Sequence, residues 1–333
     1  MIVVTGASGF IGSNLVMELN RRGYTDIVAV DDYPWLRGRV RLHASCPEVR
    51  YSQWMRLTGC IDMHSLNEWL QSSGSLVSSV IHLGACSDTT ASDREWIMEN
   101  NLAYTQRLWQ WCADSRRTFV YASSAATYGD GSQGYDDACS PSRYQPLNLY
   151  GESKHLFDLW ARSQCKAPPR WAGLKYFNVY GPRENHKGRM ASVVFHGYRQ
   201  ILETGFIRLF QSNQLNMADG DQKRDFVFVR DVVAATLHFA IDSVRYENGL
   251  YNVGTGRARS FNDLAKAIFS ALGRAPRIEY IPMPQDLRGR YQSFTEAVLF
   301  KLREAGYTNV MTSLEDGVRD YVLNHLVQKA LAA

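Results

Sequence analysis

Tyr150 and Lys154 lie four residues apart in the segment Tyr150-Gly151-Glu152-Ser153-Lys154. This spacing puts both side chains on one face of a helix, one turn apart. An ammonium group beside a phenol favours the phenolate, which lowers the pKa of the tyrosine toward the range useful for proton transfer. Most such pairs are only solvated helix faces, so the pair predicts redox catalysis only if the chain also builds a nucleotide cofactor site.

The N-terminal residues predict such a site. A short β-rich run at residues 2–4 is followed by Gly6, Gly9 and Gly12, and then by an amphipathic segment that reaches about residue 22. A strand, a glycine loop and a helix in this order are the context of a dinucleotide-binding fingerprint. The glycines allow the tight turn, the approach of the pyrophosphate and the close packing of the helix, whose N-terminus faces the anion.

The sequence leaves the choice of cofactor between NAD and NADP open. The second predicted strand ends at Asp31 and Asp32, where a carboxylate would bind the adenosine ribose of NAD. Arg37, Arg39 and Arg41 follow closely, and guanidinium groups there would instead hold the 2′-phosphate of NADP. A solvated loop is the alternative role of these arginines.

Two further predicted strands end in residues suited to a ligand. The strand at residues 77–83 runs into Gly84-Ala85-Cys86-Ser87, whose small side chains let a cofactor approach the backbone. The strand at 118–122 ends near Ser124, whose hydroxyl could hold a substrate oxygen for Tyr150. A long helix is predicted from 93 to 115. It carries Asn100 and Asn101, which either do polar work inside the protein or form an exposed pair.

The order of elements predicts an α/β fold, a Rossmann-type doubly wound parallel sheet with right-handed crossovers. After about residue 180 shorter strands and helices alternate with the sheet, so we expect a smaller, discontinuous α/β substrate lobe. The expected division is a cofactor-binding domain at 1–178, with later returns near 225–255, and a substrate lobe over most of 179–333.

Composition narrows the function further. A net charge of +4 without a continuous arginine stripe argues against a nucleic-acid partner. The sequence contains no apolar run of about 18 residues, so we expect no membrane span. The six cysteines form no C-x-x-C pair, so we expect reduced thiols and no metal. The strand pattern begins at residue 2 and leaves no room for a signal peptide, so we expect a cytoplasmic enzyme.

With these motifs in place, the chain resembles the extended short-chain dehydrogenase/reductases, the NAD-dependent epimerase/dehydratase family. The resemblance is most specific to the ADP-L-glycero-D-manno-heptose 6-epimerases and runs nearly end to end. The stretches that carry it are Gly84-Ala85-Cys86-Ser87-Asp88-Thr89-Thr90, Ala122 to Gly129, Tyr176 to Glu184, His186-Lys187-Gly188-Arg189-Met190-Ala191-Ser192, Arg224-Asp225-Phe226, Asn252 to Gly256 and Gly289-Arg290-Tyr291-Gln292.

The resemblance implies an isomerase that inverts carbon 6 of an ADP-bound heptose for the inner core of lipopolysaccharide. Bound NADP would oxidise this carbon and then return the hydride to the opposite face of the ketone. Tyr150 would serve one face and Lys187 the other, with a Lys187 pKa lowered by burial and neighbouring positive charge. Ser124 would hold the reacting oxygen, and Lys154 would bind the nicotinamide ribose and tune Tyr150.

The resemblance also implies contacts, together with a homo-oligomer, a pentamer in the family. For the cofactor, the candidate residues are Gly6, Gly9, Phe10, Ile11, Gly12, Asp31, Asp32, Arg37, Arg39, Leu83, Gly84, Ala85, Cys86, Ser87, Asn100, Tyr150, Lys154, Val179 and Lys187. For the substrate, they are Ser124, Asn178, Arg189, His196, Phe210, Gln211, Ser212, Asn213, Arg224 and Tyr291.

The chain departs from the family pattern at Arg189, which replaces a serine, and in segment 33–60, which matches least well. Two other functions stay open. One is a UDP- or GDP-sugar epimerase or dehydratase, although the residues after Ser124 lack the acidic pair of a dehydratase. The other is a dinucleotide-binding regulator without activity, although such proteins typically lose the tyrosine or the lysine that this chain keeps.

Overall fold

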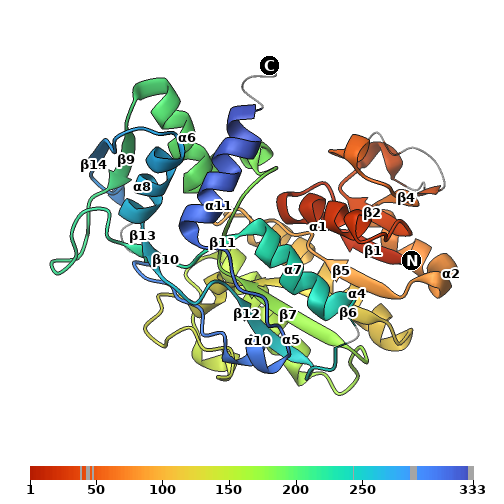
Figure 1. Ribbon diagram of the computed structural model, residues 1–333. Helices are drawn as coiled ribbons and strands as arrows, with labels where there is room; N and C mark the ends of the chain where they lie inside the picture. Colours follow the sequence, from red (N-terminus) through yellow and green to blue (C-terminus); the bar gives the residue numbers. More distant parts are fainter. Residues whose placement is uncertain (38–39, 43–45, 47–48, 243, 286–290, 329–333) are drawn as a thin grey trace.

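The computed structural model describes residues 1–333 except 38–39, 43–45, 47–48, 243, 286–290 and 329–333. Its centre is an eight-stranded sheet in the order β12-β7-β6-β5-β1-β2-β4-β3, in which only the β3–β4 pairing is antiparallel (Figure 1). The strands are β1 (Ile2–Thr5), β2 (Ile27–Asp31), β3 (Val40–Leu42), β4 (Gly59–Asp62), β5 (Ser79–His82), β6 (Thr118–Ser124), β7 (Trp171–Tyr176) and β12 (Gly249–Val253).

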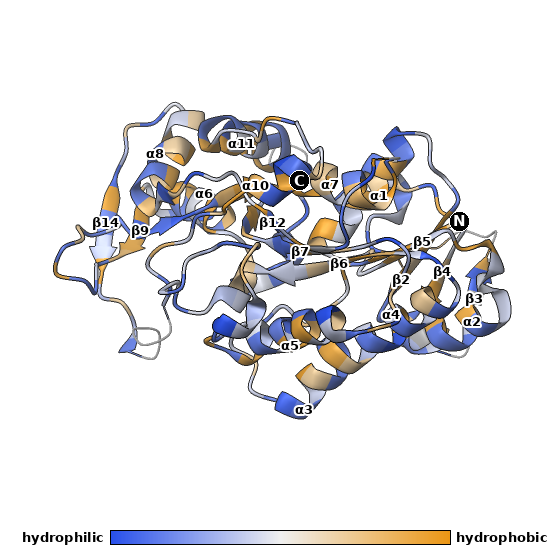
Figure 2. Ribbon diagram, turned by 90° about the horizontal axis from the view of Figure 1, so that it is seen from below, coloured by the Kyte–Doolittle hydropathy of each residue, from blue (hydrophilic) through white to orange (hydrophobic). Residues whose placement is uncertain are grey.

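Helices cover both faces of this sheet, as the alternating pattern predicts. Figure 2 shows α1 (Phe10–Arg21) and α7 (Val229–Ala240) on one face, with α4 (Tyr104–Asp114) and α5 (Leu149–Ser163) on the other. Neighbouring residues of a strand point to opposite faces, so Val4 joins the core beneath Leu15 while Val3 packs with Trp109. The doubly wound Rossmann-type fold is confirmed.

The helix predicted at 93–115 is present, but its hydrogen-bond pattern changes along its length. It begins as α3 (Arg94–Ile97), continues as the π-helix η5 (Met98–Ala103) and ends as α4. Single π turns inside helices often occur at functional sites. Here the π turn contains both asparagines, and only Asn101 is buried.

A group of shorter elements gathers beyond one end of the sheet (Figure 2). Three two-stranded sheets belong to this region: β8 (Asn178–Tyr180) with β11 (Phe226–Phe228), β9 (Ile207–Phe210) with β14 (Ile278–Ile281), and β10 (Lys223–Arg224) with β13 (Arg259–Ser260). Three helices pack with them: α6 (Val193–Thr204), α8 (Phe261–Ala271) and α11 (Leu314–Tyr321), which continues as the π-helix η9 (Val322–Val327).

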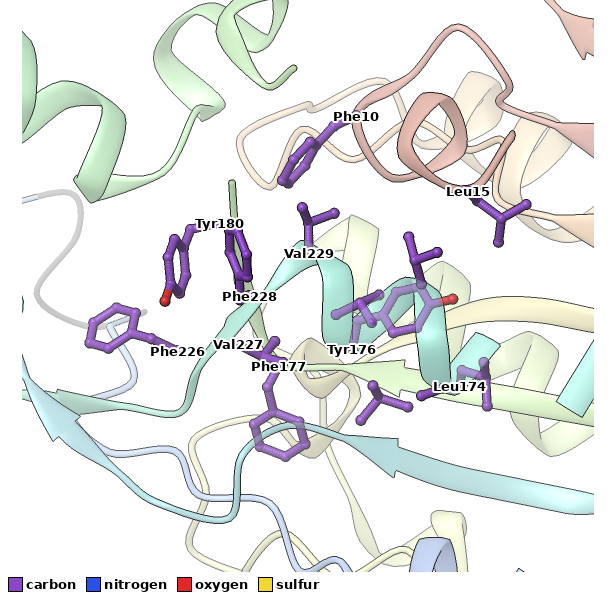
Figure 3. Close-up of a cluster of buried hydrophobic side chains, with 14 of the residues drawn as sticks. Phe10, Leu15, Leu174, Tyr176, Phe177, Tyr180, Phe226, Val227, Phe228 and Val229 are labelled. Carbon is purple, nitrogen blue, oxygen red and sulfur yellow. The ribbon is translucent and has the colours of Figure 1, made fainter. Parts of the chain in front are cut away.

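A shared hydrophobic cluster joins the sheet to this region. Figure 3 shows side chains from the β7–β8 segment and from β11 and the start of α7, with Phe10 of α1 nearby. Because Phe177 and Phe226 are buried here, the backbone at Asn178 and Val179 is held at the end of the sheet.

The remaining helices are short. They are α2 (Leu66–Ser73), α10 (Phe300–Glu304) and the 3₁₀ turns η1 (Pro34–Leu36), η2 (Ser52–Trp54), η3 (Met63–Ser65), η4 (Gly74–Leu76), η6 (Ala125–Tyr128), η7 (Pro141–Arg143) and η8 (Asn185–Met190). Among the described residues, no helix is both long enough and apolar enough to cross a lipid bilayer.

Candidate active site

A cavity of about 750 Å³ opens where β1, β5, β6 and β7 end. Strands β1 and β5 leave the glycine loop and the Gly84 loop side by side, and open parallel sheets bind ligands at such a switch point. The predicted site residues that line the cavity are Gly6, Gly9, Phe10, Ile11, Gly12, Asp31, Leu83, Gly84, Ala85, Cys86, Ser87, Ser124, Tyr150, Lys154, Asn178, Val179 and Lys187.

The shape of the glycine loop depends on the absence of a side chain at Gly6 and Gly12. Gly6 has a φ of +68°, and a Cβ there would lie 2.7 Å from the backbone nitrogen of Gly84. At Gly12 a Cβ would lie 2.0 Å from the carbonyl oxygen of Gly6. The tight turn and the close packing of the helix therefore both require glycine, as the fingerprint predicts.

The carboxylate of Asp31 lies in the wall of the cavity at the end of β2. It accepts hydrogen bonds from the backbone nitrogens of Ser8 (2.9 Å) and Asp32 (3.0 Å). Burial raises the pKa of Asp31, while these two bonds and the charge of Arg50 lower it. Arg50 also donates from its backbone to the Ser8 hydroxyl (3.3 Å). Its guanidinium Nη1 lies 3.5 Å from the Ser8 carbonyl oxygen.

Arg50 contacts Ser8 and acts on the charge of Asp31, although it does not line the cavity. The arginine predicted at Arg37 is exposed, and its guanidinium lies 3.8 Å from the carboxylate of Asp32. Neither Arg37 nor Asp32 lines the cavity, and Arg39 lies outside the described residues. The cation that acts on the Asp31 carboxylate is instead Arg50, which the sequence did not single out.

Tyr150 and Lys154 project from the first turns of α5 into the cavity. The helix begins there because the Asn148 side chain accepts a hydrogen bond from the Gly151 nitrogen (2.8 Å), an N-cap contact. Burial raises the pKa of Tyr150, and a hydrogen bond with Ser124 lowers it. Burial lowers the pKa of Lys154 to about 8.

The pKa shifts of Tyr150 and Lys154 differ from one expectation. We predicted that Lys154 would lower the pKa of Tyr150, but in the structure Ser124 is the group that does so. The physical reason is that both side chains of the pair are buried, so each is disfavoured in its charged form. Ser124 is well placed because β6 ends at this residue, and its hydroxyl accepts a hydrogen bond from the Ala126 nitrogen at 3.1 Å.

Asn101 connects the Cys86 loop to α5, the helix that carries Tyr150 and Lys154. Its side chain accepts from the Cys86 nitrogen (2.8 Å) and donates to the Cys86 carbonyl oxygen (3.0 Å) and to the Ser153 hydroxyl (3.0 Å). Of the two asparagines, Asn101 is therefore the one that makes hydrogen bonds inside the protein. Asn100, the predicted cofactor contact, donates to the Trp96 carbonyl oxygen of its own helix and does not line the cavity.

Lys187 enters the same cavity from η8, on a different part of the chain from Tyr150. Its ammonium nitrogen lies 5.5 Å from the centre of the Phe10 ring. Burial lowers the pKa of Lys187, and the charge of Glu184 raises it. Burial, Arg50 and Lys187 together lower the pKa of the neighbouring His186 to about 4, so this imidazole is neutral near pH 7. The predicted downward shift at Lys187 is present, with burial as its cause.

Arg189, predicted as a substrate contact, makes a different contact in this structure. Its guanidinium pairs with the Asp88 carboxylate (3.0 Å) and hydrogen-bonds to the Thr90 hydroxyl. Hydrogen bonds from Thr90 and Arg189 lower the pKa of Asp88 to about 2. Asp88 lines the cavity, so Arg189 bridges the loop after β5 and the Lys187 segment at the edge of the site.

The other predicted substrate residues lie beyond the cavity wall. The buried guanidinium of Arg224 lies 4.8 Å from the centre of the Tyr291 ring and 5.7 Å from that of Phe261, which does line the cavity. The Tyr291 ring also contacts Phe210 at the end of β9 (6.4 Å). This part of the site is a cation held against aromatic rings, an arrangement suited to a phosphate or a base.

His196 and the segment after β9 complete the list of predicted substrate residues. His196 is half-buried on α6, and its Nε2 is buried without a hydrogen-bond partner among the described atoms. Gln211 donates from its backbone to the Ile281 carbonyl oxygen (2.8 Å), and Ser212 donates to Asp219 (2.7 Å). None of these residues lines the cavity, and neither does Asn213.

Comparisons with known proteins identify the family of this chain. A model described as "NAD dependent epimerase/dehydratase family" matches residues 2–254. Proteins named ADP-L-glycero-D-manno-heptose-6-epimerase from Fusobacterium nucleatum and Alkalilimnicola ehrlichii are each 47% identical. The alignments cover 99% of both chains for the first, and 97% of this chain and 96% of the relative for the second.

Solved structures are similar over the whole chain. The crystal structure of the Helicobacter pylori protein of the same name has a TM-score of 0.77 and 26% identity, with 97% of this chain and 95% of that chain covered. MoeE5 in complex with UDP-glucose and NAD has a TM-score of 0.73 and 25% identity, with 99% of each chain covered.

Proposed function

Because this chain belongs to the NAD dependent epimerase/dehydratase family, we propose that it converts ADP-D-glycero-D-manno-heptose to ADP-L-glycero-D-manno-heptose. The relatives named for this activity are aligned over nearly their full length, including the Lys187 segment. The observation that carries the proposal is that one cavity brings together the glycine loop, Ser124, Tyr150 and Lys187. A single reaction centre can then use two proton-transfer groups from different elements.

The proposed reaction moves one hydride and one proton at carbon 6 in each direction. The glycine loop and Lys154 would hold a nicotinamide dinucleotide, which would supply hydride transfer to and from carbon 6 and would be unchanged overall. Ser124 holds the oxygen on carbon 6, and Tyr150 or Lys187 takes the hydroxyl proton as the carbon becomes a ketone. The ketone then rotates within the cavity so that its opposite face is presented. The hydride would return to that face, and the second of the two groups supplies the proton. Lys154 binds the nicotinamide ribose beside Tyr150.

We propose NADP as the cofactor, with NAD as the alternative. Arg50 supports this choice, because its guanidinium lies at Ser8 and its charge acts on Asp31, the carboxylate of the ribose site. A cation in this position suits a 2′-phosphate. The residues present also fit the rest of a dinucleotide, since the glycine loop leaves no room for a side chain at Gly6 or Gly12.

Further proposals concern the domains, the oligomer, the location and role of the protein, and its need for a metal. Residues 1–178, with 225–255, bind the cofactor, and most of 179–333 forms the substrate lobe. The protein is a homo-oligomer, a pentamer, that acts in the cytoplasm in the supply of heptose for lipopolysaccharide. It uses no metal, so activity should persist in EDTA, and light scattering of the purified protein measures the oligomer.

The decisive experiment is incubation of the purified protein with ADP-D-glycero-D-manno-heptose. We expect the L-glycero product, identified by chromatography and NMR. Tyr150→Phe should retain the cofactor yet lower turnover by about 10²–10⁴-fold, because a positioned acid or base contributes on that scale. Tyr24→Phe, an exposed tyrosine outside the cavity, is the matched control. No product, together with activity on a UDP- or GDP-sugar, would select the alternative reaction.

A further inference from the structure

The segment that presents Lys187 has little internal support. It is a 3₁₀ turn, Asn185–Met190, that is broken at Gly188, where φ is +56° and ψ is −127°. Within it, the Lys187 nitrogen donates to the Glu184 carbonyl oxygen (2.9 Å) and the Ala191 nitrogen to the Gly188 carbonyl oxygen (3.1 Å). Turns this short do not hold a fixed geometry without outside contacts. Some other group must therefore fix the position of Lys187.

Glu184 supplies such contacts, although its side chain does not line the cavity. It is fully buried, and its two carboxylate oxygens accept hydrogen bonds from the backbone nitrogen and the hydroxyl of Ser192, both at 2.6 Å. The Gly181 nitrogen donates to the same carboxylate at 3.3 Å. The Glu184 side chain thus joins the two ends of the segment 184–192, which contains Lys187.

The far end of this loop is rigid. Ser192 is the N-cap of α6, and its hydroxyl oxygen accepts from the Phe195 nitrogen (3.3 Å) while its hydrogen is donated to Glu184. The Glu184 carboxylate is therefore attached to the first turn of a twelve-residue helix. Burial raises the pKa of Glu184, and the hydrogen bonds from Ser192 and Gly181 oppose this rise by favouring the carboxylate.

The same carboxylate is the counter-charge of Lys187. Burial lowers the Lys187 pKa, and the charge of Glu184 raises it. Burial raises the pKa of Glu184, and the charge of Lys187 is among the groups that lower it. The other titratable groups around the pair are His186, whose pKa Arg50 and Lys187 depress, and Tyr321 of α11, which hydrogen-bonds to Glu184. The ammonium group also lies near the ring of Phe10 on α1, which carries no charge.

We propose that Glu184 is a positioning residue for the second proton-transfer group: its carboxylate locks loop 184–192 to α6 and so holds Lys187 in the cavity. The inference rests on the proposed function for the role of Lys187, but its geometric part does not. Glu184→Gln keeps the shape of the side chain and removes the charge, so it is the variant of choice.

The test is a double-mutant cycle with Lys187→Met. Glu184→Gln alone should lower kcat by about 100-fold with little change in KM, because a displacement of about 1 Å in a reacting group costs that much. In the Lys187→Met background the same substitution should change kcat less than about twofold, since both act on one group. Equal losses in both backgrounds would show a general structural role and overturn the inference.

The pH profile gives a second reading. Glu184→Gln removes an anion near Lys187, so the protonated form of Lys187 is less favoured and its pKa falls. The limb of the pH–rate profile that belongs to Lys187 is the one that disappears in Lys187→Met. We expect this limb to move to lower pH in Glu184→Gln. An unmoved limb contradicts the proposal. Ser192→Ala removes one donor and keeps the backbone nitrogen, so it should shift kcat in the same direction but less. This variant keeps the proposal testable if Glu184→Gln fails to fold.

A chemical measurement separates this inference from the proposed function. Acylation of lysines at pH 8, followed by peptide mass spectrometry, should label Lys187 several-fold faster in Glu184→Gln than in the wild type. Lys154, held within α5, serves as the internal reference. An unchanged Lys187 rate overturns the inference even if the wild type has no epimerase activity. Absence of that activity with faster labelling would overturn only the proposed function.

Discussion

Lys175 and Asp158 form an ion pair inside the protein, with 2.6 Å between the ammonium nitrogen and a carboxylate oxygen. Both side chains are almost completely inaccessible to solvent, at 1% and 0%. Asp158 also accepts from the hydroxyls of Ser123 (2.7 Å) and Tyr121 (2.8 Å), so it joins α5 to the end of β6. The pair lies one helical turn beyond Lys154, and it connects the elements that carry Ser124 and Tyr150.

Lys175→Met should destabilise the protein by about 3–5 kcal/mol, because it leaves the buried carboxylate of Asp158 without its cation. Urea unfolding at pH 7 measures the change. Lys166→Met is the control, since Lys166 pairs with Asp114 at an exposed site and such pairs contribute little. Equal stability of the two variants would contradict the prediction.

Lys154→Met should stabilise the protein near pH 7 while it abolishes activity. The pKa of Lys154 is about 8 in the folded state and lies near 10.5 in the unfolded chain. Between pH 8 and pH 10.5 the amine is therefore protonated in the unfolded chain and neutral in the folded protein. Stability of the wild type therefore rises from pH 8 to pH 10.5. The variant lacks this rise, and its advantage of roughly 3 kcal/mol at pH 7 should vanish as the pH approaches 10.5. Unfolding free energies at pH 7 and pH 10 check this, with exposed Lys266→Met as the reference.

Arg50→Ala should weaken NADP binding by about 10–100-fold and leave NAD binding nearly unchanged. A charge-assisted hydrogen bond to a phosphate is worth about 1.5–3 kcal/mol, and only NADP carries the 2′-phosphate. Calorimetric titration of the cofactor-free protein with each dinucleotide gives both affinities. Arg37→Ala, which removes an exposed arginine paired with Asp32, should affect neither. A similar loss for both dinucleotides would remove the reason for assigning NADP to Arg50.

Asn101→Ala should raise the dissociation constant of the cofactor by about 10-fold. The substitution leaves the Cys86 nitrogen without its acceptor, and an unsatisfied buried donor costs about 1–3 kcal/mol. The neighbouring Asn100→Ala is the control, because Asn100 bonds only within its own helix among the described contacts. Weaker cofactor binding in Asn100→Ala, with none in Asn101→Ala, would restore the sequence-based assignment of Asn100.

The parts of the fold that depend on local sequence were predictable. Apolar runs such as residues 77–83 and 118–122 indicated buried parallel strands, and the glycine spacing at Gly6 and Gly12 indicated the turn that the structure contains. The start of α6 at Val193 is also local, because the Ser192 hydroxyl caps the helix.

The contacts that could not be predicted join residues far apart in the chain. Arg50 reaches Ser8 across 42 positions, and Arg189 reaches Asp88 across 101. Each looks like an ordinary surface arginine in the sequence, since its role depends on which loops the sheet brings together. The pKa of Tyr150 was misjudged for a similar reason, because the burial that dominates it comes from the fold and not from the helix.

The position of β12 has a consequence for synthesis of the chain. This strand covers the edge of β7, yet β7 ends at Tyr176 and β12 begins only at Gly249, 73 residues later (249 − 176). At ~5–20 residues per second, a ribosome needs roughly 4–15 s to make that interval. Throughout it the β7 edge is open to pairing with other nascent chains. A translation stop inside the interval should therefore release a fragment that aggregates, even though it contains the glycine loop and Tyr150.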